Sequence, residues 1–139
     1  MLYNYKIPCQ KSRLGEIRKF LNGILSGQDI SEVDINSLIL AVDEMCANII
    51  IHTHNCNPKE SIELSIDIQS DGILFEIEDK GTGFDIGEYQ EPSLKDIIHN
   101  KKKGGLGLIL VRRIMDEIKL VRNNNRNIYR LYKKLKSTS

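Results

Sequence analysis

The sequence predicts an α+β fold: a two-layer sandwich in which helices cover one face of a mixed, mostly antiparallel sheet. Three observations lead to this prediction. Several short stretches alternate apolar and polar residues, which is typical of half-buried strands. Two longer stretches, 12–25 and 33–52, repeat apolar residues at helical spacing. Asp71-Gly72 separates two alternating stretches and favours a tight hairpin, so the strands on either side are expected to be antiparallel.

The chain is expected to begin with a strand and two helices. Residues 2–7, LYNYKI, alternate and predict a strand that ends near Pro8. The first helix is expected over 12–25, with Ser12 as its N-cap. The second helix is expected over 33–52 and carries its apolar residues on one side.

Four more strands and one more helix are expected in the rest of the chain. Residues 61–69 and 73–79 form the predicted hairpin. The stretch GGLGLILVRRIMDEI, 104–118, has the pattern of a helix opened by glycines. Strands over 118–123 and 127–133 follow it and are joined by the asparagine-rich turn NNNR.

The composition indicates one globular domain over residues 1–139. Hydrophobic residues make up 40% of the chain and charged residues 28%, which is typical of a folded protein. The net charge of +1 predicts no direct attraction to nucleic acid or membrane, and no apolar run is long enough for a membrane span. Three cysteines without a CxxC pair favour reduced thiols and a cytoplasmic location.

Glu44 and Asn48 are the first candidate functional pair. They lie four residues apart on the long predicted helix, so their side chains point the same way, one turn apart. The simpler interpretation is the polar edge of an amphipathic helix. The functional interpretation is a carboxylate for base chemistry beside an amide oxygen that suits a hard cation such as Mg²⁺.

The second candidate site is the sequence Asp79-Lys-Gly81-Thr-Gly83, at the end of a predicted strand. These residues are also common in turns. However, glycines leave room for a flat ring to lie against the backbone, and a carboxylate accepts hydrogen bonds from an amino group. We therefore expect Asp79 to recognise an amino-bearing base.

The third candidate site is KKKGGLGL, 101–108, which ends the polar stretch 85–103 and opens a predicted helix. Exposed amides at a helix N-terminus favour anions such as phosphate, and the lysines add positive charge. A solvated basic loop is the alternative. A connection as long as 85–103 is typical of a functional lid or of a disordered segment. Walker-type and dinucleotide-binding motifs are absent from the sequence.

In this order, E-x-x-x-N, D-x-G-x-G and G-G-x-G-L resemble the motifs of the GHKL ATPase superfamily, the histidine-kinase-like ATP-binding domains with the Bergerat fold. Within it, the chain looks most like the small anti-sigma-factor serine/threonine protein kinases. LAVDEMCANIIIH is similar to their N-box, DKGTGFD to their G1 box, and GGLGLILVRRIMDEI to their G2 box and helix. The resemblance runs from about residue 38 to residue 118.

This resemblance implies cofactors and residue roles. Asn48 would coordinate Mg²⁺ on the phosphates of ATP, Glu44 would act as general base, and Asp79 would accept from the adenine amino group. Gly81 and Gly83 would shape the adenine pocket. About 86–103 would form the ATP lid. Further ATP contacts would come from His52, near the phosphates, and from Phe84, Lys103, Gly104, Gly105, Leu106, Gly107 and Leu108.

One feature departs from this pattern. The family often has a Gly-Thr pair near the start of the last strand, and Asn127-Ile128 stand at the matching place here. Either the alignment is shifted by a few residues, or Asp79 is held by water or by another group. Separately, His52, His54 and Cys56 could each bind zinc. However, residues two apart on a helix face different directions, so we do not expect a zinc site there.

The resemblance implies a kinase that phosphorylates a serine of an antagonist protein and sequesters a sigma factor, with a homodimer and a partner surface expected over 2–27. An alternative function is a catalytically weak or inactive ATP-binding module that acts by occupying its partner. A third is the detached catalytic domain of a sensor histidine kinase. The missing phosphoacceptor helices and the N-terminal strand argue against this third function.

Overall fold

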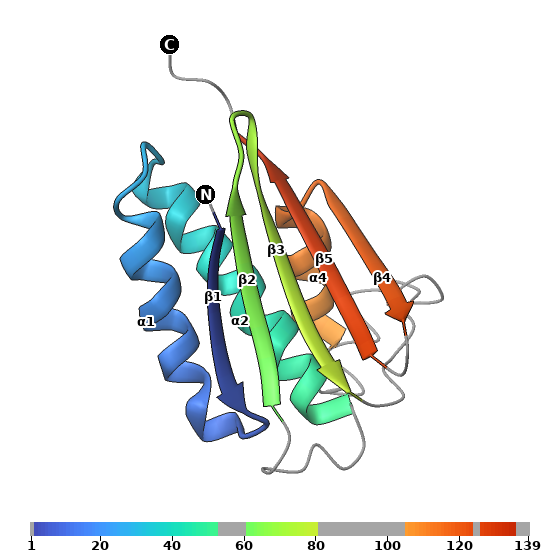
Figure 1. Cartoon of the computed structure of the whole chain (residues 1–139). Helices are drawn as coiled ribbons and strands as arrows, with labels where there is room; N and C mark the ends of the chain where they lie inside the picture. The colour runs from blue at the N-terminus through green and yellow to red at the C-terminus, as the bar shows by residue number, and fades with distance from the viewer. Residues whose placement is uncertain (1, 53–60, 81–104, 124–125, 136–139) are drawn as a thin grey trace.

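The structure is a computed structural model that describes residues 2–52, 61–80, 105–123 and 126–135. Within them the chain forms five strands, three α-helices and a short 3₁₀ helix (Figure 1). In chain order these are β1 (Leu2–Pro8), η1 (Lys11–Arg13), α1 (Leu14–Leu25), α2 (Glu32–His52), β2 (Ser61–Ile68), β3 (Gly72–Lys80), α4 (Gly105–Ile114), β4 (Glu117–Asn123) and β5 (Arg126–Lys134).

The strands form one sheet in the order β1-β2-β3-β5-β4. Every pairing among these described strands is antiparallel, so the predicted antiparallel character is confirmed and the sheet has no parallel pair there. Sequential strands joined by short turns pair directly, which is why β2 lies beside β3 and β4 beside β5. The central strand β3 pairs with β5, and this brings the C-terminal strand into the middle of the sheet.

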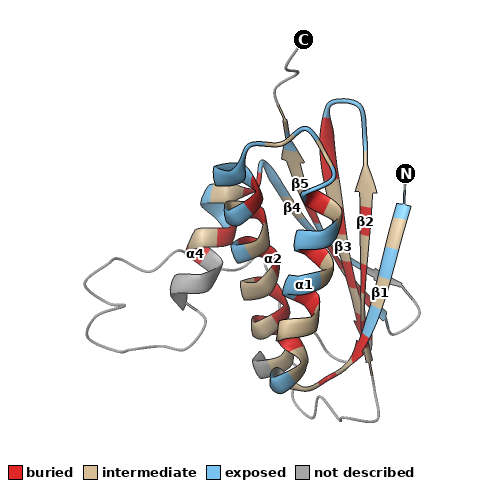
Figure 2. Cartoon of the chain, turned by 90° about the vertical axis from the view of Figure 1, so that its left-hand side faces the viewer, coloured by how far each residue is buried: buried red, intermediate tan, exposed pale blue. Residues whose placement is uncertain are grey.

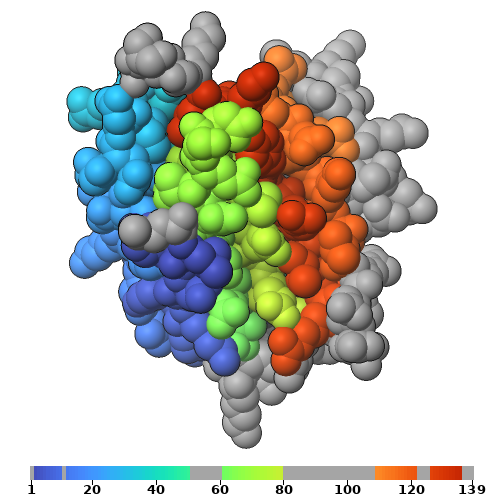
Figure 3. Space-filling model, turned by 45° about the horizontal axis from the view of Figure 1, so that its top comes forward, coloured from blue at the N-terminus to red at the C-terminus, as the bar shows by residue number. Residues whose placement is uncertain are grey.

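Helices α1, α2 and α4 all lie against one face of the sheet, which confirms the predicted two-layer sandwich (Figure 2). The reason is visible in β3, where Ile73, Phe75 and Ile77 are fully buried and the residues between them are only half-buried. Figure 3 shows that side chains of the strands themselves make up the opposite face. The core lies between the two layers and includes Ile17, Leu21, Leu38, Val42, Met45, Ile62, Leu64, Ile66, Val111, Tyr129 and Leu131.

The turn between β2 and β3 confirms the predicted hairpin. The amide of Gln69 donates to the carbonyl oxygen of Gly72 over 2.9 Å. Gly72 also packs closely against β5, because a Cβ atom at this position would lie 2.6 Å from the carbonyl oxygen of Lys133. A glycine is required at this point by the close approach of two backbones.

Two predicted helix ends were wrong. Arg13, and not Ser12, occupies the N-cap of α1, and its side chain makes no capping hydrogen bond. The helix expected over 104–118 ends at Ile114 in α4. Past this end, the amide of Asp116 donates to the carbonyl oxygen of Tyr132 over 2.8 Å. The chain has therefore already turned to pair with β5.

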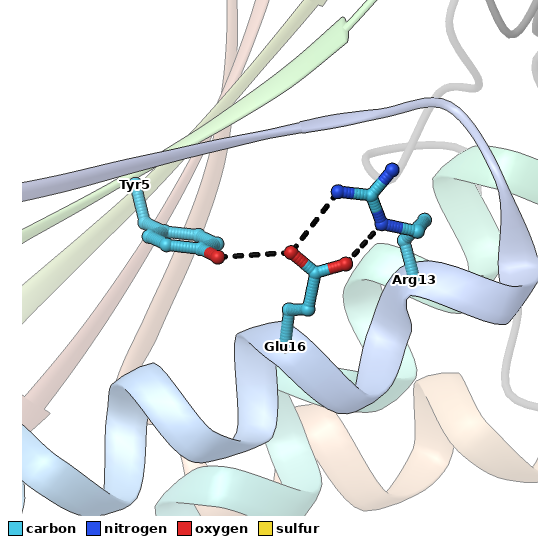
Figure 4. A network of polar contacts seen from close by, with 3 residues as sticks. All are labelled: Tyr5, Arg13 and Glu16. Carbon is cyan, nitrogen blue, oxygen red and sulfur yellow. Dashed lines mark hydrogen bonds and ion pairs between the residues drawn. The ribbon is translucent and has the colours of Figure 1, made fainter.

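A polar network joins β1 to the start of α1 (Figure 4). The hydroxyl group of Tyr5 donates to Oε1 of Glu16 over 2.9 Å, and the guanidinium group of Arg13 donates to both carboxylate oxygens of Glu16. The ring of Tyr5 also stacks on Phe20, with centroids 4.9 Å apart. These contacts hold the edge strand against the helical layer.

The cysteines differ from the sequence-based expectation. Cys9, just after β1, is disulfide-bonded, whereas Cys46 is a free thiol buried in α2. Burial raises the pKa of the Cys46 thiol far above its usual range, so this thiol behaves as a core residue. The expectation of three reduced thiols was therefore wrong for Cys9, because sequence spacing does not show which cysteines meet in space. In the described part of the chain, no helix is long and apolar enough to cross a membrane.

Candidate nucleotide-binding site

Three segments that carry the candidate motifs meet at one end of the molecule. The C-terminal end of α2, the C-terminal end of β3 and the N-terminal end of α4 all lie at the lower end in Figure 1. Helix α2 packs on α4, and both cover the sheet. Residues that are far apart in the sequence therefore surround one region between the helices and the sheet.

Asn48 is buried on α2, one turn before the helix ends. Its side chain is 1% exposed, and its Nδ2 group donates to the main-chain carbonyl oxygen of Glu44 over 2.7 Å. The Oδ1 atom is also buried, and it has no hydrogen-bond partner among the described residues. A buried acceptor without a partner costs about 1–3 kcal/mol of stability. A buried acceptor of this kind calls for a partner such as a water molecule, an ion or a ligand.

Glu44 lies one turn before Asn48, and its side chain is only half-buried. Both residues lie on the observed helix α2 one turn apart, and the side chain of Asn48 contacts the main chain of Glu44 and not its carboxylate. The neighbouring Asp43 pairs with Arg18 of α1, with 3.0 Å between Nη1 and Oδ1. This ion pair ties the two helices together beside Glu44.

Asp79 is buried near the end of β3. Its side chain is 3% exposed and lies on the same face of the strand as Phe75 and Ile77, the face that the helices cover. Its Oδ1 atom is buried without a hydrogen-bond partner among the described residues, although the residue takes part in other interactions. A carboxylate in this position is directed into the layer between sheet and helices, and not into the solvent.

Asn127 is a buried residue beside Asp79 that was not among the predicted site residues. It stands directly opposite Asp79 in the pairing of β3 with β5, and its side chain is 2% exposed. The sequence showed only that the threonine usual in the family is missing at this place. The Asp71-Gly72 hairpin fixes the register of β3 against β2 only. The sequence does not show which strand pairs with the other edge of β3, so it could not place Asn127 opposite Asp79.

The third segment supplies backbone amides. Helix α4 begins at Gly105, so its first turn contains Gly105, Leu106, Gly107 and Leu108, whose backbone is described while their side chains are not. The first amides of a helix have no partner within the helix and carry a partial positive charge. Val111 of α4 is buried in the core, and the helix packs on α2. The first turn can therefore receive an anion.

Several predicted site residues lie outside the described part of the chain: Gly81, Gly83, Phe84, Lys103, Gly104 and the lid over 86–103. His52 ends α2, and only its backbone is described. His54 and Cys56, the other two possible zinc ligands, also lie outside the described part of the chain. Within the described ranges, no group of three or more histidine, cysteine, aspartate or glutamate side chains could hold a metal ion.

A comparison with known families identifies the domain that contains these three segments. Residues 7–133 match the histidine kinase-like ATPase domain. The chain belongs to this family. The match covers all three motif segments, β5 up to its last residue and only the end of β1, so the family resemblance stated from the sequence is confirmed.

Curated relatives of this ATPase domain are serine-protein kinases. The chain is 29% identical over 123 residues to serine-protein kinase RsbW of Bacillus velezensis, which covers 86% of this chain and 77% of the relative. It is 31% identical over 121 residues to RsbW of Staphylococcus aureus, which covers 81% of this chain and 74% of the relative. It is 27% identical over 119 residues to RsbW of Bacillus subtilis, with 83% and 74% covered.

Solved structures confirm the fold of this ATPase domain. The RsbU and RsbW domains of a Mycobacterium tuberculosis protein superpose with a TM-score of 0.66 at 12% identity, covering 96% of this chain and 32% of that one. The Pseudomonas aeruginosa SiaB-SiaC complex gives a TM-score of 0.64 at 18% identity, covering 96% and 89%. At these identities the likeness concerns the arrangement of sheet and helices.

Proposed function

We propose that this chain is an ATP-dependent serine/threonine protein kinase of the anti-sigma-factor type. Residues 1–139 act as one ATP-binding domain with a lid over 86–103. The kinase transfers the terminal phosphoryl group of ATP to a serine of an antagonist protein, and it also sequesters a sigma factor in the cytoplasm. Relatives near 30% identity that are named serine-protein kinases support this proposal.

The observation that carries the proposal is the buried Oδ1 atom of Asn48. An amide oxygen is a hard ligand of the kind that Mg²⁺ binds in nucleotide sites. The hydrogen bond from Nδ2 to the Glu44 carbonyl fixes the amide, so the oxygen and not the nitrogen is presented to the ligand. The residues present therefore fit a magnesium–nucleotide complex, and Asn48 would be the protein's ligand to the metal.

The other residues divide the remaining work. Asp79, with Gly81 and Gly83, receives the adenine ring and accepts a hydrogen bond from its amino group. The amides of Gly105, Leu106, Gly107 and Leu108 face the phosphates, where the helix N-terminus favours negative charge. His52, Phe84, Lys103 and Gly104 complete the contacts to ATP.

Glu44 acts as the general base. Its half-buried position, one turn from Asn48, leaves the carboxylate accessible to a second protein. It takes the proton of the serine hydroxyl group as the serine oxygen bonds to the terminal phosphorus and ADP leaves. Bound magnesium neutralises charge on the phosphates, and the protein supplies position, amides and a base.

Labelled ATP provides the test of kinase function. The chain would be incubated with Mg²⁺, labelled ATP and the antagonist that co-purifies with it from its native cell. We expect label on a serine with the wild type, and a rate about 10²–10⁴ lower with Glu44→Gln. Glu32→Gln, an exposed glutamate at the start of the same helix, is the matched control and should transfer at the wild-type rate.

Two results would change the conclusion. If wild type and Glu44→Gln are equally inactive while both bind the sigma factor, the chain is an ATP-binding module without transfer. A thermal-shift measurement separates the remaining case. Ligand at about 100 times its dissociation constant should add roughly 2.7 kcal/mol to the free energy of unfolding. No shift with millimolar ATP and Mg²⁺ would exclude nucleotide binding altogether.

A further inference from the structure

We propose that Asn127 selects the purine base, by holding the Asp79 carboxylate with one amide N–H and donating the other to the ring nitrogen N1 of adenine. This inference rests on the proposed ATP-binding function and adds a specificity residue to it. It assigns a role to the position where the family's usual threonine is missing.

The register of the sheet puts the two side chains together. Asp79 and Asn127 are directly opposite each other in the β3–β5 pairing. Directly opposite residues of antiparallel strands have Cβ atoms about 5 Å apart and point to the same face. On β5 this is the face of the fully buried Tyr129 and Leu131. The amide of Asn127 and the carboxylate of Asp79 therefore share the layer that the helices cover.

The buried carboxylate of Asp79 also needs a hydrogen-bond donor beside it. A carboxylate that is 3% exposed requires hydrogen-bond donors, because burying a charge without them is costly. The neighbouring cation Arg126 is engaged elsewhere, since its Nη1 atom lies 2.8 Å from Oε1 of Glu78. Glu78 and Arg126 are each one residue away from Asp79 and Asn127, so this ion pair lies on the opposite face of the sheet.

The chemistry of an asparagine amide then distinguishes the bases. Its NH₂ group carries two donors, whereas a hydroxyl group carries one. Adenine presents an amino donor and the N1 acceptor side by side, which matches a carboxylate acceptor next to an amide donor. Guanine and hypoxanthine present a carbonyl oxygen and an N1–H group at the same positions. The carbonyl oxygen would then face the Asp79 carboxylate, and the N1–H group would face the Asn127 amide donor. Both contacts would be repulsive.

The test is a comparison of ATP with 1-deaza-ATP, which keeps the 6-amino group but lacks the N1 acceptor. Dissociation constants would be measured by calorimetry, with Mg²⁺ present, for the wild type and for Asn127→Leu, which keeps the side-chain size and removes both donors. We expect the wild type to bind ATP roughly 3- to 10-fold more tightly than 1-deaza-ATP. In Asn127→Leu this ratio should fall to about one, and ATP should bind more weakly.

Controls separate this role from a structural one. Asn4→Leu changes an exposed asparagine of β1 and should keep the wild-type ratio. Asn127→Ser retains a single donor, so it should lose part of the preference even where the leucine variant does not fold. A loss of stability without a change in the ratio would point to a packing role and overturn the inference.

The outcomes also separate this inference from the proposed function. If the wild type binds ATP but does not distinguish 1-deaza-ATP, or if Asn127→Leu keeps the wild-type ratio, the inference fails and ATP binding stands. If the wild type binds neither nucleotide, the proposed function fails and this inference fails with it.

Discussion

The side chain of Asn48 donates a 2.7 Å hydrogen bond to the main-chain carbonyl oxygen of Glu44, one turn earlier on α2. This bond fixes the orientation of the amide, so the buried acceptor Oδ1 points away from the helix backbone. The two residues that the family motif pairs are thus linked physically. The hydrogen bond orients the oxygen that is proposed to hold the metal.

Replacing Asn48 by leucine should separate stability from binding. Asn48→Leu removes a buried acceptor that has no partner among the described residues, so the free energy of unfolding should stay equal or rise by up to about 1–3 kcal/mol. The stabilisation by Mg²⁺ and ATP should disappear. Thermal unfolding with and without ligand would measure both effects. Asn22→Leu, on the exposed face of α1, is the control and should keep the ligand effect. Full stabilisation of Asn48→Leu by ligand would contradict the metal-binding role.

Two glycine-to-alanine substitutions should have opposite effects on stability. In Gly72→Ala the new Cβ would meet the Lys133 carbonyl oxygen at 2.6 Å, and backbone cannot move away easily. We expect a loss of about 1–3 kcal/mol. Gly23 lies on an exposed turn of α1, where an added Cβ would meet no neighbouring side chain or backbone within 4 Å. Gly23→Ala should therefore raise the free energy of unfolding by about 0.5–1 kcal/mol. Urea denaturation would measure both, and similar values for the two variants would argue against the close β3–β5 approach.

Leucine truncation should reveal where the core lies. Leu64 on β2 is fully buried, and Leu2 on β1 is 61% exposed. Leu64→Ala should cost about 2–5 kcal/mol through lost burial and the cavity left behind. Leu2→Ala should change the free energy of unfolding by no more than about 0.5 kcal/mol. Guanidinium denaturation of the pair would test this. A large loss for Leu2→Ala would indicate that another surface covers β1.

The network of Tyr5, Arg13 and Glu16 between β1 and α1 should make the stability of the fold depend on pH. The hydrogen bond from Arg13 first, and that from Tyr5 second, lower the pKa of the Glu16 carboxyl group in the folded state. A lowered folded pKa contributes stability above the unfolded pKa, near 4.3, and this contribution is lost as the pH falls through the folded value. Glu16→Gln should therefore lower the melting temperature at pH 7, and this difference from the wild type should shrink as the pH falls below the unfolded pKa.

Tyr5→Phe is the companion variant for this network. It removes one of the three hydrogen bonds to Glu16, so it should lose only part of the stability at pH 7. A gap between wild type and Glu16→Gln that stays constant from pH 7 to the acid range would contradict the role of the ionised carboxylate. Melting temperatures across the pH series would decide the matter.

Much of the fold follows from local patterns in the sequence. The alternation of apolar residues predicted β2 and β3 to within one residue at each end, and Asp71-Gly72 predicted the turn between them. Helix α2 was expected over 33–52 and is found at Glu32–His52. Side-chain alternation and helical spacing are properties of a few neighbouring residues, so each stretch reports its own backbone geometry and buried side.

The ends of elements were predicted less well, because they depend on distant neighbours. Ser12 was expected to cap α1, but it lies inside the short 3₁₀ helix η1, and Arg13 occupies the N-cap. Helix α4 was expected to continue to residue 118, but it stops where Asp116 pairs with Tyr132. At the end of α4 a contact across the molecule outweighed the local preference.

By itself, the sequence determined which residues face the core and the order of the three motifs that identify an ATPase domain. Only the tertiary structure decided that β5 enters the sheet beside β3 and sets Asn127 against Asp79. It also decided that Cys9 is disulfide-bonded and that the C-terminal ends of α2 and β3 lie near the N-terminal end of α4. The physical reason is range. Burial preferences are fixed locally, whereas strand register and the meeting of distant side chains depend on packing summed over the whole core.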